Sequence, residues 1–287
     1  MSETKKRRKL DKRPIAYCVL SFFMAAFLFL LSICISLRFT LLSNDYMLST
    51  MADSEYYTQV TEEFRQNLES LGHASGLNSE FTNNFVQSMD IRQDVTDYIN
   101  AFYTGQSTVV NKTPFKQKFR AAIDQYAEEN KKEGQEPSEK ALEYLTNEAA
   151  TIYADCIQIP FFAVIANFIY KLTTPMNITI AVLALLCAVI VVIIYFTNSE
   201  FRHRTYRYLS YAFSGAFLCT IVLPAFMHFS GIISKVSINS RSLYNLFVNY
   251  FDGMFRYMWI FALAYLVLGV LFFAAFASKH KRLVNNH

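Results

Sequence analysis

The chain has 287 residues, of which 53% are hydrophobic and only 17% are charged, whereas about a quarter of residues are charged in an average soluble domain. Eight Gly and six Pro exclude collagen-like and Gly/Pro-rich disordered chains. Five Cys are too few for a disulfide scaffold. We therefore expect an all-α integral membrane protein.

Four long apolar runs predict four transmembrane helices, because a span needs about 20 apolar residues. The first run, 15–37, carries no charge and is longer than the roughly 7–15-residue core of a signal peptide, so we expect an uncleaved helix. The predicted spans are residues 15–42, 176–197, 208–230 and 257–278.

The remaining short segments are basic. The N-terminus 1–14, the loop 198–207 and the tail 279–287 together hold 13 Lys and Arg against three acidic residues. Cytoplasmic loops carry an excess of Lys and Arg. We therefore expect all three segments, and both termini, on the cytoplasmic side of the membrane.

Residues 43–172 are then expected to form a large extracytoplasmic domain inserted between the first two spans. The stretch 38–176 carries 11 basic and 19 acidic residues. An acidic surface keeps a domain soluble; a basic partner or a cation is the functional alternative. The apolar run 157–170 is short for a span, so we expect it in the outer interface, or packed on the second span after a turn at 173–175.

The extracytoplasmic domain is expected to be a bundle of four to five antiparallel helices, because apolar residues recur in it at helical spacing and strand-like alternation is absent. Val60, Phe64 and Leu68 form one such stripe, and Phe115 and Phe119 belong to another.

Local signals predict where some of these helices begin and end. Asn78 or Ser79 is expected to cap one helix, and Thr113 followed by Pro114 is expected to begin another. Gly105 is expected to end a helix. The very polar stretch 128–139 predicts an exposed tip.

A second outer segment, 231–256, predicts an amphipathic helix. Its helically spaced apolar residues and its basic residues could dock on the acidic domain as a structural brace, and binding of lipid headgroups is the alternative. The candidate interaction or brace surface consists of Leu243, Phe247, Tyr250, Met254, Arg241 and Arg256.

Cysteine usage favours a bacterial envelope. Cys156 is the one cysteine outside the predicted spans, so the outer domain cannot form an internal disulfide. A eukaryotic surface domain would usually be stapled by disulfides. The expected location is therefore a bacterial cytoplasmic membrane.

Motifs for catalysis and for metal or cofactor binding are absent from the sequence. It contains no Walker loop, no G-x-S-x-G and no H-E-x-x-H, and no His has a His or Cys neighbour at ligand spacing. We expect no catalytic residues, no metal, no other cofactor and no nucleic-acid partner.

The apolar runs 15–37, 176–197, 208–230 and 257–278 contain no Asp, Glu, Lys or Arg, although ion-coupled carriers usually keep an ionisable group within the bilayer. His228, one turn after Pro224, is the candidate proton-linked position. An interfacial histidine beside a helix kink is the alternative interpretation.

By elimination, we expect a non-enzymatic interaction or accessory subunit of an envelope assembly, acting through its extracytoplasmic domain. Its expected partners are membrane lipids and either a protein or a second copy in the membrane. One alternative is a subunit of a transport or export system, and another is a membrane enzyme acting on lipid or cell-wall precursors.

Overall fold

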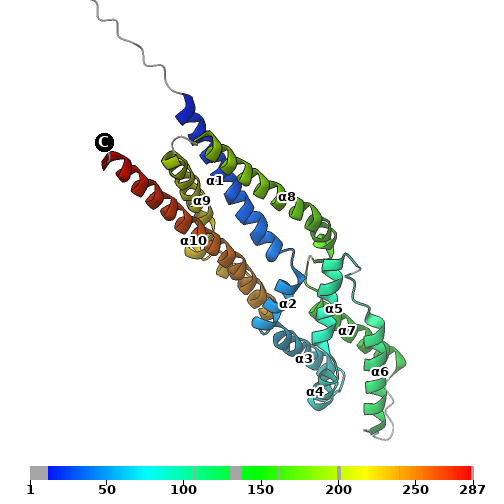
Figure 1. Cartoon of the computed structure of the whole chain (residues 1–287). Helices are drawn as coiled ribbons and strands as arrows, with labels where there is room; N and C mark the ends of the chain where they lie inside the picture. Colours follow the sequence, from blue (N-terminus) through cyan, green and yellow to red (C-terminus); the bar gives the residue numbers. More distant parts are fainter. Residues whose placement is uncertain are drawn as a thin grey trace, which may run out of the picture. The chain divides into compact units, whose positions relative to one another are not determined.

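The computed structural model describes residues 12–106, 108–129, 138–160, 162–198, 202–238 and 240–285. Within these ranges every regular element is a helix (Figure 1), which confirms the expected all-helical class for this part of the chain. The basic residues 1–11, most of the expected polar tip (130–137) and residues 199–201 and 286–287 lie outside the described ranges.

The chain divides into two compact units. Unit 1 comprises Met1–Phe39, Thr174–Lys235 and Asp252–His287, and unit 2 comprises Thr40–Thr173 and Val236–Phe251. The long helices α8 (Phe162–Thr197) and α10 (Arg241–Asn285) each contribute residues to both units.

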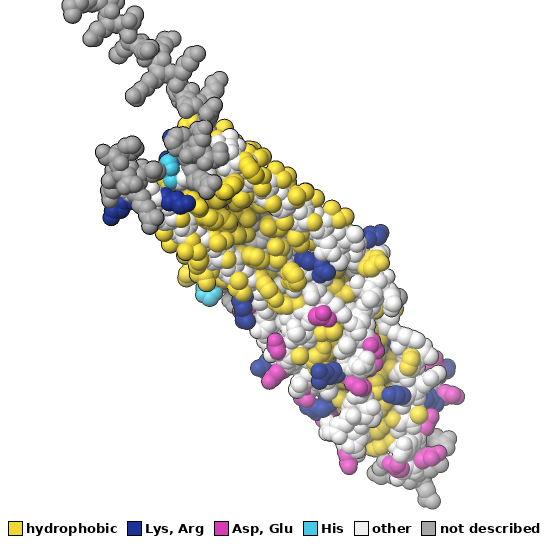
Figure 2. All heavy atoms as spheres, viewed as in Figure 1, with side chains coloured by type: hydrophobic (Ala, Val, Ile, Leu, Met, Phe, Trp, Pro, Cys, Tyr) yellow, Lys and Arg dark blue, Asp and Glu magenta, His cyan; other side chains and the backbone are white. Residues whose placement is uncertain are grey.

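Four helices are long and apolar enough to cross a membrane, as the sequence predicts. They include α1 (Lys12–Phe39) and α9 (Arg202–Ser230), and the apolar stretches are Pro14–Phe39, Val164–Thr197, His203–Ser230 and Arg241–Lys279. Hydrophobic side chains crowd the visible surface of unit 1 (Figure 2). Exposed apolar surface on this scale is unfavourable in water, so these helices are suited to a lipid environment.

Small residues let α1 and α9 pack closely within unit 1. Ala212 and Ala216 are fully buried, and a Cβ atom at Gly215 would lie only 3.1 Å from the Cβ of Ala25. One buried hydroxyl joins two helices of this unit: Tyr265 donates to the carbonyl oxygen of Leu28 at 2.9 Å. Close approach through small residues is a usual mode of helix association in membranes.

Two helices extend beyond the spans predicted for them. The 45-residue helix α10 is about 68 Å long at 1.5 Å per residue, roughly twice the thickness of a bilayer's hydrocarbon core. The helix continues through Gly253. A single glycine lowers helix stability by only about 1 kcal/mol, which a helix of this length tolerates. The expected turn at 173–175 is wrong, since α8 continues through Pro175. The chain instead breaks before α8, around Pro160, because the residue preceding a proline is restricted to extended backbone.

Unit 2 is built around α3, which packs against α2, α4, α5 and α7, while α6 packs against α4 and α7 (Figure 1). The helices α2 to α7 are, in order, Asn44–Asp53, Tyr56–Ala74, Ser79–Gln87, Ile91–Thr104, Lys112–Glu129 and Glu139–Ile157.

The core of unit 2 is rich in aromatic rings. Phe64 and Phe119 are fully buried, and the ring of Phe115 stacks on Tyr153 with centroids 4.4 Å apart. Edge-to-face contacts join Phe85 to both Phe115 and Phe119. Such aromatic pairs contribute about 0.5–1.5 kcal/mol each beyond the burial of their area.

The helix ends of unit 2 follow the sequence signals in most places. Asn78 caps α4 by accepting from the backbone N–H of Phe81 at 2.8 Å, and Gly105 ends α5 in the left-handed region at φ 71°. The start of α6 differs from the prediction: Asn111, not Thr113, supplies the capping oxygen, accepting from the Thr113 N–H at 3.0 Å.

Candidate functional site

The six residues of the candidate brace surface divide between the two units. Leu243, Phe247 and Tyr250 lie in the part of α10 that belongs to unit 2, where Tyr250 is buried in its core. Arg241, the first residue of α10, is exposed. Met254 and Arg256 fall in unit 1.

The candidate proton-linked residue lies at the end of a helix in unit 1. His228 is exposed in the last turn of α9, and its ring lies edge-on to that of Phe229 at 5.5 Å. Because the imidazole of His228 is exposed, its protonation would not bury a charge or displace a packed helix.

Polar contacts hold the first turn of α10 to α3. The Glu63 carboxylate accepts hydrogen bonds from the Ser242 backbone N–H at 3.0 Å and from the hydroxyls of Ser240 and Ser242 at 2.9 and 3.1 Å. The amide of Asn245 donates to Gln59 at 2.9 Å. A carboxylate at a helix N-terminus is favoured by the helix dipole and the unpaired backbone N–H groups.

An apolar cavity lies within unit 2, with a volume of about 570 Å³. Its walls come from the start of α2, the end of α5, residues 159–165 and residues 237–251. Three of the residues predicted for the brace surface, Leu243, Phe247 and Tyr250, line it. The cavity has the size of a small-molecule site, which spans roughly 300–1,000 Å³.

The tyrosine hydroxyls around this cavity are occupied by protein partners. Tyr103 donates to the carbonyl oxygen of Leu41 at 3.1 Å and also bonds to the Tyr250 hydroxyl; burial raises the pKa of Tyr103 to about 12. Tyr46 donates to the carbonyl oxygen of Tyr250 at 3.1 Å. The cavity therefore presents mainly hydrocarbon and ring surface.

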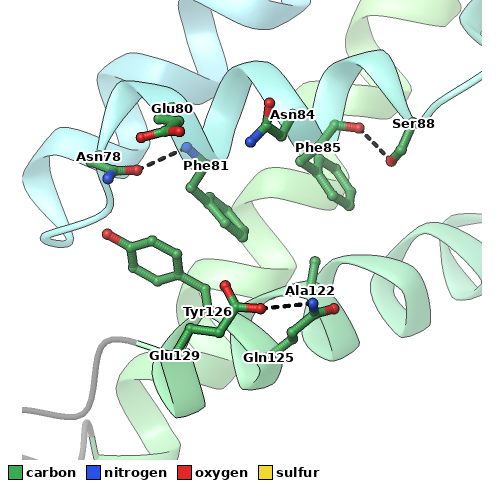
Figure 3. Close-up of a pocket in the computed structure, with 10 residues that line it drawn as sticks. All are labelled: Asn78, Glu80, Phe81, Asn84, Phe85, Ser88, Ala122, Gln125, Tyr126 and Glu129. Atoms are coloured by element: carbon green, nitrogen blue, oxygen red, sulfur yellow. Dashed lines mark hydrogen bonds between the residues drawn. The ribbon is translucent and has the colours of Figure 1, made fainter.

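A second hollow, the α4–α6 groove, has a different character. Ten described residues line it, none of them basic, and Phe81, Phe85 and Tyr126 form its aromatic floor. Glu80 on α4 and Glu129 on α6 lie on opposite rims (Figure 3). The volume of the groove is about 390 Å³.

The rim of the α4–α6 groove offers groups for hydrogen bonding. Glu80, Asn84, Gln125 and Glu129 are all exposed, and the Gln125 amide donates to Glu129 at 2.9 Å. An aromatic floor with a polar, solvent-accessible rim is the composition of many protein-recognition surfaces.

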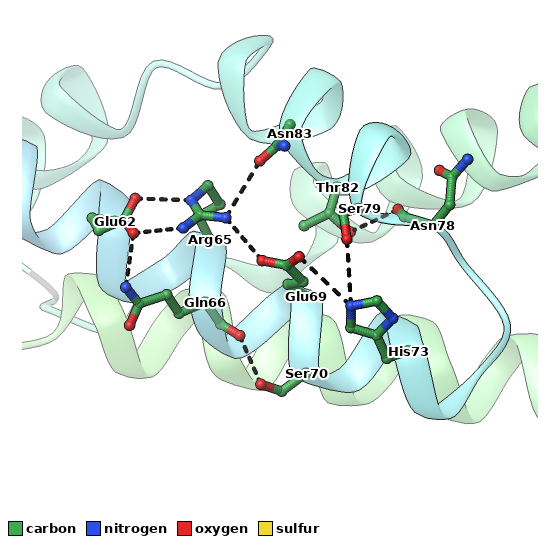
Figure 4. A network of polar contacts seen from close by, with 10 residues as sticks. All are labelled: Glu62, Arg65, Gln66, Glu69, Ser70, His73, Asn78, Ser79, Thr82 and Asn83. Carbon is green, nitrogen blue, oxygen red and sulfur yellow. Dashed lines mark hydrogen bonds and ion pairs between the residues drawn. The ribbon is translucent and has the colours of Figure 1, made fainter.

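A Ser–His–Glu cluster joins the end of α3 to the start of α4. The Nε2 atom of His73 lies 3.3 Å from the Ser79 hydroxyl and 3.6 Å from a carboxylate oxygen of Glu69 (Figure 4). In a catalytic triad the carboxylate contacts Nδ1, so that Nε2 is left for the serine. Here both partners approach the same nitrogen, so the cluster is not arranged as a triad.

Arg65 forms ion pairs with two carboxylates at this cluster. It bonds Glu62 at 2.6 Å and Glu69 at 2.8 Å on successive turns of α3. Hydrogen bonds from Arg65 and Gln66 hold the pKa of Glu62 at about 2. Hydrogen bonding from Ser79, together with the nearby charges of Arg65 and His73, lowers the pKa of Glu69. Both carboxylates are therefore ionised at neutral pH, and neither can serve as a general acid there.

Cys156 lies beside Glu63 and Asn67 in a small hollow of unit 2. Burial raises the pKa of its thiol to about 11. Because the thiolate is the nucleophilic form, this protonated thiol is a packing group at neutral pH.

Among the described residues, no group of three or more His, Cys, Asp or Glu side chains could hold a metal ion. Comparison of the chain with protein-family models, with curated proteins and with solved structures finds no match. The interpretation of these sites therefore depends on their geometry and chemistry.

Sequence reasoning missed the rim of the α4–α6 groove and most of the cavity wall. A signal for the rim was present, because Glu80, Asn84 and Ser88 recur every four residues beside the aromatic positions. Tyr103 carries a weaker signal, as an aromatic residue lying off the apolar face of α5. The sequence pattern places these residues on one side of their own helix. It does not show which other helix they face, because that depends on tertiary packing.

Proposed function

We propose that this chain is a non-enzymatic protein of a bacterial cytoplasmic membrane and acts as an interaction or accessory subunit of an envelope assembly. Unit 2 forms the extracytoplasmic binding part. The chain crosses the membrane four times, with both termini in the cytoplasm. This orientation is supported by the basic residues of 1–14, 198–207 and 279–287, which the positive-inside rule assigns to the cytoplasm.

The observation that carries the proposal is the α4–α6 groove. Its acidic rim, formed by Glu80 and Glu129, and its aromatic floor suit a partner segment that carries Lys or Arg next to apolar residues. Charge complementarity of this kind speeds association and selects partners, and contact with the aromatic rings would supply most of the affinity.

The two alternative functions have less support. Catalysis at the Ser79–His73–Glu69 cluster would need the histidine to bridge serine and carboxylate through different ring nitrogens. Catalysis by Cys156 would need a thiolate. Ion-coupled transport usually needs an ionisable group inside the bilayer, and His228 is exposed at the end of its helix.

The test is chemical cross-linking in native membranes, followed by affinity purification of the full-length chain and identification of its partners. The double variant Glu80→Lys/Glu129→Lys reverses both charges of the rim. The matched control, Glu143→Lys/Glu148→Lys, makes the same change in net charge at two exposed positions of α7.

We expect the rim variant to recover at least fivefold less of one envelope protein than the parent and the control do. The recovered partner should cross-link through a segment containing Lys or Arg. Equal recovery by the rim variant and the control would contradict the groove as the binding site. Recovery of only the chain itself would replace the accessory role with self-association.

A further inference from the structure

We propose that the apolar cavity of unit 2 holds an acyl chain of a membrane phospholipid. This site is distinct from the α4–α6 groove, and the inference goes beyond the proposed interaction with a protein partner. It rests on the lining of the cavity, on the state of its hydroxyl groups and on the helices that form its walls.

The lining of the cavity is almost entirely hydrocarbon. Of the fifteen described residues that line it, three carry a polar side-chain group: Ser237, Tyr103 and Tyr250. Phe102 and Phe162 stack at 4.4 Å on one wall, and Phe247 lies 4.6 Å from Phe251 on another. None of these described lining residues is charged.

The polar atoms near the cavity select for an apolar occupant. The hydroxyls of Tyr103 and Tyr46 donate to backbone carbonyl oxygens, and Tyr250 bonds to Tyr103. A ligand that brought hydrogen-bonding groups into this space would leave them poorly paired, which is unfavourable for buried polar groups. An alkyl chain carries no such group.

Two walls belong to helices that are apolar enough to enter a bilayer. Ile165 lies within the stretch Val164–Thr197, and Leu243 and Phe247 lie within Arg241–Lys279. A phospholipid chain could reach a cavity built on these helices along apolar surface, whereas a soluble apolar ligand would have to arrive through water. This favours a lipid of the surrounding membrane as the source of the chain.

The experiment uses the full-length chain in nanodiscs of defined phospholipid, with a photoactivatable diazirine near the end of one acyl chain. A parallel arm adds palmitic acid carrying the same group. Labelled peptides are quantified by mass spectrometry, and labelling of peptides covering 159–165 and 238–251 is divided by labelling of those covering 203–230. This ratio corrects for general exposure to lipid.

The cavity is filled by Ile165→Trp, and independently by Ile238→Trp, since both residues line it. The matched control is Ile178→Trp, the same substitution at an exposed isoleucine of the same helix α8. All variants are first compared with the parent by circular dichroism and thermal unfolding, and only those that keep the parental fold are scored.

We expect phospholipid labelling of the wall peptides in the parent and in Ile178→Trp, and at least a fivefold lower ratio in a folded filling variant. An unchanged ratio in the filling variants would overturn the proposal, as would unlabelled wall peptides in the parent. Labelling by palmitic acid without labelling by the phospholipid would overturn the assigned source. None of these results depends on the recovery of a protein partner at the α4–α6 groove.

Discussion

The carboxylate of Glu63 in α3 accepts a hydrogen bond from the backbone N–H of Ser242 in the first turn of α10, at 3.0 Å. These residues are 179 positions apart in the sequence. The contact therefore ties Val236–Phe251 to the rest of unit 2. The same carboxylate also accepts from the hydroxyls of Ser240 and Ser242. An acidic side chain at a helix N-terminus thus adds to the apolar packing of Leu243 and Tyr250 that the sequence predicts for this segment.

Glu63→Gln should loosen the start of α10. The amide keeps one acceptor oxygen but removes the charge that the helix N-terminus favours, and hydrogen bonds to charged groups contribute about 1.5–3 kcal/mol each. We expect faster tryptic cleavage around residues 235–241 in the folded protein. The control is Asp155→Asn, an acid-to-amide change at an exposed neighbouring position, and this variant should be cleaved at the parental rate. Equal cleavage rates in the parent and both variants would show that the Glu63 contact contributes little.

Removing a core ring should destabilise unit 2. Phe64 and Phe119 are fully buried, and truncation of a buried phenylalanine to alanine costs about 3–5 kcal/mol. Phe64→Ala or Phe119→Ala should therefore lower the midpoint of thermal unfolding strongly in detergent. Tyr144→Ala, at an exposed aromatic of α7, is the control and should leave the midpoint near the parental value. A loss below about 1 kcal/mol at Phe64 would contradict its place in the core.

Cys156 should react slowly with iodoacetamide in the folded protein. Burial raises the pKa of its thiol to about 11, so the reactive thiolate is scarce at about pH 8 and its fraction rises as the pH increases toward 11. In a variant with the other four cysteines replaced by alanine, we expect the alkylation rate to climb up to about pH 11.

The control for this measurement is Ser138→Cys in a fully cysteine-substituted background, because Ser138 is exposed. Its alkylation rate should level off near the ordinary thiol pKa of about 8.5. Coincident pH profiles for the two thiols would contradict the burial of Cys156.

The apolar face of α10 should stabilise unit 2 more than its arginines do. Tyr250 is buried, and Phe247 lines the cavity, whereas Arg241 and Arg256 are exposed. Phe247→Ser/Tyr250→Ser should therefore raise the protease sensitivity of unit 2 several-fold. Arg241→Glu/Arg256→Glu should raise it only slightly, because exposed ion pairs contribute about 0–1 kcal/mol. Unchanged proteolysis in the serine variant, with loss of a bound partner, would make this face a binding surface instead.

The sequence predicts helical faces well and helix ends less well. Val60, Phe64 and Leu68 are buried as their spacing indicates, because helical periodicity directly selects the face that leaves water. Tyr56, four residues before Val60, is buried in the same core. Asn111 caps α6 although Thr113 and Pro114 form the stronger local signal, since several neighbouring residues can satisfy the same backbone groups.

The limits of α8 and α10 were less predictable, for a physical reason. Hydropathy marks the residues that a bilayer requires and carries no information on whether a helix continues beyond them. The start of α10 is stabilised by packing of Leu246 and Tyr250 in the core of unit 2 and by Glu63, which is distant in sequence. Contacts of this kind also create the α4–α6 groove and the cavity, so neither could be located from local patterns.

The placement of unit 2 outside the cytoplasm is the central claim, and cysteine labelling in intact cells tests it most directly. In a cysteine-free background, Gln106→Cys and Ser138→Cys place thiols at exposed sites of unit 2, and Arg204→Cys and Lys281→Cys place them at exposed sites of the basic segments. We predict that a membrane-impermeant maleimide labels the first pair in intact cells and the second pair only after permeabilisation. Labelling of Arg204→Cys or Lys281→Cys in intact cells, or protection of both Gln106→Cys and Ser138→Cys, would contradict the proposed orientation and the binding role that depends on it.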